Sequence, residues 1–576
     1  MKIHLERVYF RTEAFALALT VVFGAVSLMI LASALSWSAN TMRLNTRNNQ
    51  YFRTLAGAEA ATEAVISRLD ADFQASGDAL VQTNLTSYRQ IVPTPSQNSY
   101  WAGYIFGNDL GQTGQTQVVF FPPNQFRELS SQYRGLNGYA SSYHVVSDAR
   151  EKNGSFGIVA GVEQDIETAT IPLFQFAIFY NMDLEICPGP NMTISGPVHS
   201  NGILYSQPQA ALTYQNDVTA VGSIIHDKKP GDPTVRTFGS ITYLGEHDGG
   251  VNSLNLPIGT NNSPAAVRQV VEKPPTGEVA TSAMGKQRYY NQADMVITVT
   301  DTGVTATSGL VDNFGTTIPK AQVNTFVDTS VTFFNKREND TIKTTQIDVA
   351  KLRQWNGTNK VLRTILPFAD VRIVYVNDQR TQSGSTEAGV RLVNGDTLLP
   401  QGLTVATPNP LYVKGHYNVP ATARGTSDTS QTLPASLVAD AITILSPNWT
   451  DANSSKSLAN RQAADCTVNA AFLAGIVETV SGSYSGGVEN FPRFLEDWSN
   501  DTFTYNGSMV VMFDSIYATG LWQGTGSAFD IYNPPTRNWN FDTNFRNPTK
   551  IPPGTPSARV VVRGTWTAIT PKYPLN

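Results

Sequence analysis

Three carboxylates in the segment GGVENFPRFLEDW (486–498) are the best candidates for acid–base chemistry in this chain. Glu489, Glu496 and Asp497 lie there beside three aromatic side chains. A glycosidase needs two carboxyls at a set separation across a cleft, one of them with a raised pKa. Spacings of seven and one do not identify such a pair. A short amphipathic helix, FPRFLEDW, that plugs a β structure with its apolar side chains is the simpler interpretation.

The histidines and acidic loops give no established metal pattern. None of the six histidines has a second ligand at helical spacing, and neither HExxH, GxSxG nor a P-loop occurs. His199, His226 and His247 follow one another at intervals of 27 and 21 residues, and we interpret them as turn residues in preference to stacked ligands. Weak candidates for an oxygen-rich calcium site are Asn500, Asp501, Asp530 and Asp542. We therefore expect no catalytic constellation, cofactor or metal site.

Cys187 and Cys466 are the two cysteines of the chain. They either form one disulfide in an oxidising compartment or remain two buried, unpaired thiols, and the sequence leaves both open. No CxxC occurs, which excludes a zinc ribbon or a thioredoxin-type redox site.

The composition excludes two broad classes of protein. The 576 residues are 41% hydrophobic and 15% charged, which is unlike a disordered chain. The net charge is −5 and no Lys/Arg block follows the first residues, so we expect no nucleic-acid partner. The 44 glycines and 32 prolines favour turns and short strands over long helices.

These side chains are carried by a body that follows a candidate membrane anchor. Ala14–Trp37 contains no charged residue, and its 24 residues make a helix of roughly 36 Å, enough to cross a bilayer. A cleavable signal has a shorter apolar core, although Ala32–Ala34 resembles a cleavage site. Basic residues are balanced across the span, so the short leader, 1–13, places the N-terminus in the cytoplasm.

Helical periodicity continues beyond the span through residues 38–75, where polar residues cover one side and apolar residues the other. One helix is therefore predicted from about Ala14 to Phe73. Its packing face, against copies of the protein or its own head, would consist of Leu19, Leu44, Leu55, Ala58 and Leu69.

The stretches RTEAFALALTVVFGAVSLMILASAL and NNQYFRTLAGAEAATEAVISRL resemble the N-terminal helix of PilX-type minor pilins and related type IV pilin-like proteins. The resemblance implies removal of the leader between Ala14 and Phe15. Pilins usually have glycine where Ala14 stands, and major pilins have glutamate where Leu19 stands. The second departure is similar to the K-type minor pseudopilins and implies a tip or accessory role.

The rest of the chain is predicted to be β-rich. Residues 76–190 form a mixed, strand-rich region, and residues 191–420 carry the motifs MTISGPVHSNGILY, VTAVGSII and RTFGSITYLG. These repeat glycine before small and aliphatic residues at about 20-residue intervals, which is typical of a parallel β-solenoid. Antiparallel β-sandwich domains are the alternative. Residues 421–576 form a β-rich C-terminal region with an aromatic tail; together with GPVHSNG and PPTRNWNFDTNF they resemble the bodies of large PilX-like proteins.

The sequence thus predicts a mainly β protein with a long N-terminal α-helix. We expect a structural, non-enzymatic, pilin-like component of the inner membrane, single-pass, with its large C-terminal domain extracytoplasmic and displayed in a pilus-like assembly. Its expected partners are membrane lipid and other pilin-like or envelope assembly proteins, with a surface polysaccharide as a further candidate. The alternative is a membrane-anchored solenoid protein that binds or cleaves polysaccharide.

Overall fold

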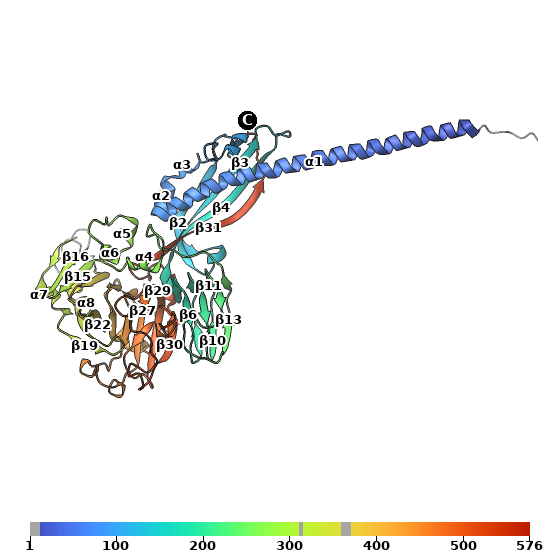
Figure 1. Ribbon diagram of the computed structural model, residues 1–576. Coiled ribbons are helices and arrows are strands. Elements are labelled where there is room, and N and C mark those ends of the chain that lie inside the picture. Colours follow the sequence, from blue (N-terminus) through green and yellow to red (C-terminus); the bar gives the residue numbers. More distant parts are fainter. Residues whose placement is uncertain (1–11, 310–314, 359–369, 576) are drawn as a thin grey trace, which may run out of the picture.

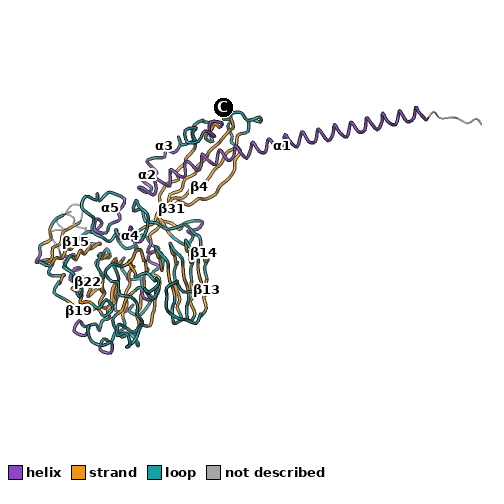
Figure 2. The backbone as a smooth tube through the Cα atoms, in the orientation of Figure 1, coloured by secondary structure: helices purple, strands orange, loops and turns teal. Residues whose placement is uncertain are grey.

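The computed structural model describes residues 12–309, 315–358 and 370–575. A single helix, α1 (Thr12–Ser76), projects far beyond a large β-rich body (Figure 1). Figure 2 shows that the body is built of strands and loops, with short helices only at its periphery. The predicted fold class, a long N-terminal helix followed by a mainly β region, is confirmed.

The second half of α1 lies on an antiparallel sheet, which we call the stem sheet. Its strands pair in the order β1, β3, β4 and β31, and β2 also pairs with β3. The strands are β1 (Tyr104–Gly107), β2 (Gln117–Glu128), β3 (Asn137–Glu151), β4 (Val159–Pro172) and β31 (Ser557–Ile569). Two short helices, α2 (Asp78–Thr83) and α3 (Leu85–Tyr88), follow α1 and cover the end of the sheet.

The stem sheet is closed by the last strand of the chain. β31 pairs antiparallel with β4 along nearly its whole length. Residues 173–556 are therefore an insertion between two neighbouring strands of one sheet. The chain leaves and re-enters the sheet at the same point, because Leu173 N donates to the carbonyl oxygen of Pro556 at 2.9 Å. Leu173 and Phe174 at this junction are fully buried, so the body is packed firmly onto the stem sheet.

The first part of the insertion is a parallel β-solenoid with three faces. In one face, Ile178 pairs with Val198, and Val198 pairs with Val218, so each coil is 20 residues long. The first face contains β5 (Ile178–Tyr180), β8 (Val198–Ser200), β11 (Val218–Ala220) and β14 (His247–Gly249). The second contains β6 (Leu184–Ile186), β9 (Leu204–Ser206) and β12 (Ile224–Ile225), and the third contains β7 (Met192–Ile194), β10 (Ala211–Tyr214) and β13 (Ser240–Tyr243). Parallel rungs were the expectation for these motifs, and the antiparallel alternative is wrong here.

The second part of the insertion continues the same architecture with longer coils. One parallel ladder runs through β20 (Asp340–Asp348), β22 (Thr386–Gly395), β24 (Leu411–Tyr417), β26 (Ile442–Leu445) and β28 (Pro492–Phe494). A second runs through β15 (Met295–Thr300), β21 (Ile373–Asp378), β23 (Leu403–Ala406), β25 (Ala435–Ala439), β27 (Cys466–Ile476) and β29 (Thr502–Asp514). Because β29 also pairs with β5, the two parts share one continuous sheet and one apolar core.

The remaining elements decorate this core. β30 (Thr536–Phe541) extends the sheet beside β29. The other strands are β16 (Gly303–Ser308), β17 (Thr317–Ile318), β18 (Val327–Asp328) and β19 (Thr332–Asn335). The short helices are α4 (Pro264–Arg268), α5 (Ala283–Gln287), α6 (Tyr289–Gln292), α7 (Lys320–Val323) and α8 (Val349–Thr358).

Two expectations need correction. The segment FPRFLEDW is not a helix: its residues 492–494 form β28, paired in parallel with β26. Its aromatic and aliphatic side chains are buried as expected, but in a rung of the solenoid. The C-terminal residues also divide differently from the expected region 421–576, because 557–569 belong to the stem sheet and the parallel coils run on to 541.

Candidate functional site

The projecting half of α1 is the most conspicuous surface of the protein. Every residue from Phe15 to Asn49 is exposed except the half-buried Thr41. At ~1.5 Å per residue these 35 positions extend for roughly 52 Å. This helix contains an 18-residue window of mean hydropathy 2.5, none of it buried, and it is long and apolar enough to cross a membrane. A helix so apolar and so exposed requires lipid or other apolar surfaces around it.

The second half of α1 has a different environment. Ala58 and Leu69 are completely buried: Ala58 contacts Ala149 and Val162 of the stem sheet in one cluster, and Leu69 lies in another. The expected packing face therefore divides. Leu19 and Leu44 are 46% and 58% exposed, whereas Ala58 and Leu69 are occupied by the protein's own sheet and cannot contact another copy.

Leu55 is half-buried against the same cluster as Ala58. The predicted cleavage position remains a prediction: Phe15 is 72% exposed on α1, and the side chain of Ala14 lies outside the described residues. Polar contacts fix the boundary between the two halves. Arg53 Nε donates to Glu151 Oε1 at 2.7 Å, and Gln50 Oε1 accepts from the main-chain nitrogen of Phe156 at 3.2 Å.

The histidines of the solenoid do not converge on a metal. His199 is buried, with one ring nitrogen 2.8 Å from Thr219 Oγ1 and the other 2.9 Å from Asn201 Oδ1. Burial lowers the pKa of His199 to about 4, so the ring is neutral. His226 and His247 both stack on Tyr243. His199 is thus a core residue, contrary to the expected turn position, and the other two are exposed.

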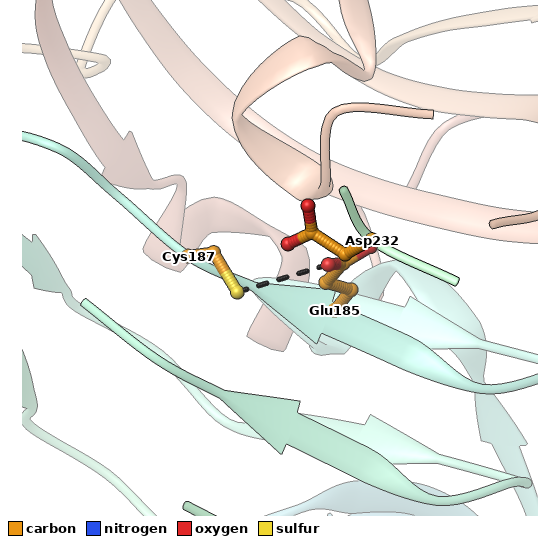
Figure 3. Close-up of side chains that lie close together, drawn as sticks. All are labelled: Glu185, Cys187 and Asp232. Carbon is orange, nitrogen blue, oxygen red and sulfur yellow. Dashed lines mark hydrogen bonds between the residues drawn. The ribbon is translucent and has the colours of Figure 1, made fainter. Parts of the chain in front are cut away.

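A buried cluster of Glu185, Cys187 and Asp232 lies at the edge of the solenoid (Figure 3). One ligand atom from each lies within 4.8 Å of the others, and in the described part of the chain this is the only group of three or more His, Cys, Asp or Glu side chains so arranged. The four residues proposed as weak calcium ligands form no such group. Cys187 Sγ donates to Glu185 Oε1 at 3.9 Å, and Thr479 Oγ1 donates to Glu185 Oε2 at 2.9 Å.

The charges of this cluster are already compensated. Burial, reinforced by repulsion from Asp232, raises the pKa of Glu185 to about 8, so the carboxyl holds its proton at neutral pH. Asp232 forms an ion pair with Arg236, and burial raises the pKa of the Cys187 thiol. A divalent ion would have to remove the Glu185 proton and compete with Arg236. The arrangement is a hydrogen-bonded internal cluster.

The two cysteines are free and buried, so no disulfide joins Cys187 to Cys466. Of the two interpretations left open by the sequence, the unpaired thiols are the correct one. Cys466 lies in β27, and its thiol donates to the Gly415 carbonyl oxygen at 3.2 Å.

The carboxylates of 486–498 do not form a glycosidase pair. Glu496 is buried and accepts from Ser446 N at 2.6 Å and from Ser446 Oγ at 2.7 Å. Asp497 accepts from Asn533 and Ser499. Glu489 accepts from Cys187 N at 2.6 Å through Oε1, and its Oε2 has no partner. Burial raises the pKa values of Glu489 and Glu496 to about 7.

Glu489 also lines a groove of about 550 Å³ between the third face of the solenoid and β30. One wall is formed by residues 188–195 and the other by residues 534–540. The lining combines four prolines, amide and hydroxyl side chains, and Trp539 from the aromatic tail. Sequence analysis proposed the aromatic tail as a binding surface but could not place it against a wall some 340 residues earlier in the chain.

Comparisons with known proteins add little. No family model and no curated protein matches the chain. Among solved structures, the crystal structure of the competence-associated pilin ComZ from Thermus thermophilus aligns with 90% of this chain and 98% of that chain. The identity is 12% and the TM-score is 0.27, which is too low for the likeness to indicate a shared fold or role.

Proposed function

We propose that this protein is a membrane-anchored, pilin-like structural subunit that carries its β-solenoid body outside the cytoplasm. The observation that supports this best is the division of α1 at Gln50. Before this residue the helix is apolar and exposed, and from it onward the helix is buried against the stem sheet. One rigid helix can therefore serve as the anchor in a bilayer and as the support of the folded body.

The same division suits assembly with other subunits. A helix stored in lipid can exchange lipid contacts for contacts with neighbouring apolar helices without exposing its surface to water. Leu19 and Leu44 remain free for such contacts. Leu19 stands where the major pilins to which the N-terminus bears resemblance have glutamate, which favours an accessory or tip position. The inner membrane and a cytoplasmic N-terminus complete the proposal.

The body fits a display role. Its chain enters and leaves through one buried junction, so the stem sheet holds both ends of the insertion. A body held at both ends follows the orientation of α1. This geometry presents the far end of the solenoid at a fixed distance from the membrane.

The anchor is tested by a charge substitution within the span. Leu28 is 67% exposed on α1, and Leu28→Lys should shift the full chain from the membrane to the soluble fraction, since a charge at the centre of a span costs about 3 kcal/mol on insertion. Asn48→Lys, on the same helix but beyond the apolar stretch, is the matched control and should stay in the membrane. Equal membrane fractions for both variants would contradict an anchoring role for this segment.

A further inference from the structure

The groove between the solenoid and β30 has features that the anchoring role leaves unexplained. Two charged side chains line it, Glu489 and Arg537, and their signs are opposite. The remaining lining is uncharged and includes the amides of Asn538, Asn540 and Gln215. A polyanion or polycation would find no net countercharge here, so the lining suits a neutral ligand.

Several hydrogen-bonding atoms at the groove have no partner within the protein. They are Glu489 Oε2, Arg537 Nε and Trp539 Nε1. Glu489 is 5% exposed, and its Oε1 is already fixed by Cys187 N, so Oε2 cannot turn away to another partner. Unpaired buried polar atoms are unfavourable and rare in folded proteins. Three of them around one groove indicate a ligand with both donors and acceptors.

The main chain of β30 adds further donors. β30 pairs with β29 on one side alone, and the amides of Thr536 and Asp542, at even positions, point to that side. The amides at odd positions therefore point toward the groove. The amide of Phe541 donates to Ser195 Oγ at 3.0 Å, which leaves those of Arg537 and Trp539. Two amides are too few for an extended peptide to pair as a further strand, which disfavours strand addition.

The apolar part of the groove is rigid. The guanidinium of Arg537 lies 5.4 Å from the ring centre of Trp539 and donates to the Glu489 carbonyl oxygen at 3.0 Å, so both side chains are held in place. Prolines at 188, 190, 534 and 535 stiffen both walls. A preformed site loses little conformational entropy on binding.

We infer that this groove binds a neutral carbohydrate chain. Sugar hydroxyls both donate and accept hydrogen bonds, and the C–H faces of sugar rings match an indole and prolines. The amide and hydroxyl side chains at the mouth would contact the outer hydroxyls, and the atoms around Glu489 and Trp539 the inner ones. Glu489 is the one carboxylate among the residues that line the groove. Since hydrolysis of a glycosidic bond requires a pair, the groove binds without cleaving.

A blocking substitution tests the inference. Thr193 is exposed on β7 at the mouth of the groove, and Thr193→Trp fills that mouth. Thr242 of β13 is the matched control: through Thr213 it occupies the same outward column of the third face, it is exposed, and it lies outside the groove. Trp539→Ala is a second variant that removes the indole.

The probes are neutral hexasaccharides of glucose, mannose, galactose and N-acetylglucosamine, added to the full chain in detergent and measured by calorimetry. We expect at least one to bind, and Thr193→Trp and Trp539→Ala to weaken its binding at least tenfold, with Thr242→Trp within twofold of wild type. Unfolding curves of each variant show whether the loss is local. Failure of all four sugars to bind, equal binding by Thr193→Trp, or displacement of the sugar by polyanionic heparin or by an unstructured peptide would overturn the inference. None of these outcomes depends on whether α1 is an anchor.

Discussion

Truncation of Leu69 tests whether α1 divides into a supporting half and a free half. Leu69 is completely buried in a cluster with Val65, Phe73 and Tyr88. Leu69→Ala leaves a cavity between helix and stem sheet, and such substitutions destabilise by about 2–5 kcal/mol. At ~3 kcal/mol the ratio of folded to opened stem falls by roughly 100-fold. Leu28→Ala, on the exposed half of the same helix, should change stability by less than about 0.5 kcal/mol.

Hydrogen–deuterium exchange on the full chain in detergent measures this difference locally. Peptides from β3 and β4 report opening of the stem sheet, because these strands pair with each other and face α1. We expect their slowest amides to exchange about 100-fold faster in Leu69→Ala and at the wild-type rate in Leu28→Ala. Equal rates in the two variants would refute the packing of the second half of α1 against the sheet.

Three further predictions concern the body. The native state keeps the Glu185 proton up to about pH 8, whereas the unfolded chain loses it near pH 4.5, so stability should fall as pH rises between these values, and Glu185→Gln should reduce this slope by about 1.4 kcal/mol per pH unit in thermal melts. Gly239→Ala should destabilise the solenoid in urea titrations, because a Cβ atom would lie 2.0 Å from the Ala210 carbonyl oxygen of the preceding coil. Without reductant, a thiol reagent should find no reactive cysteine in the native protein and two per chain after denaturation, Cys187 and Cys466.

Matched controls make these predictions specific. Gly189→Ala meets only the flexible end of Gln209, at 3.3 Å, and should be tolerated where Gly239→Ala is not. Stability that rises with pH from 5 to 8 would contradict the protonated state assigned to Glu185. A single reactive thiol, or none, after denaturation would contradict the unpaired cysteines.

The sequence predicted those features that depend on local patterns. The uncharged span and the periodicity of residues 38–75 indicated one long helix, because each turn repeats the same facing. The 20-residue recurrence of glycine and aliphatic residues indicated parallel coils, because each coil repeats the same bend. Both signals arise within one element or between successive coils.

The features that the sequence missed depend on contacts between distant segments. Nothing in residues 557–569 shows that they pair with β4 across nearly 400 residues of insertion. FPRFLEDW has apolar residues at both helical and strand spacings, and its place beside β26 decides for the strand. The groove likewise unites residues 188–195 with 534–540, and the pKa of Glu489 depends on burial that no local pattern reports.

The central claim, that α1 is a pilin-type anchor and assembly element, is tested most directly by the N-terminal sequence of the protein in native membranes and in sheared surface material. The account predicts a new N-terminus at Phe15, with part of the protein in the sheared fraction. An intact Met1, found in the membrane fraction alone, would contradict a pilin-like role and leave α1 as a simple anchor.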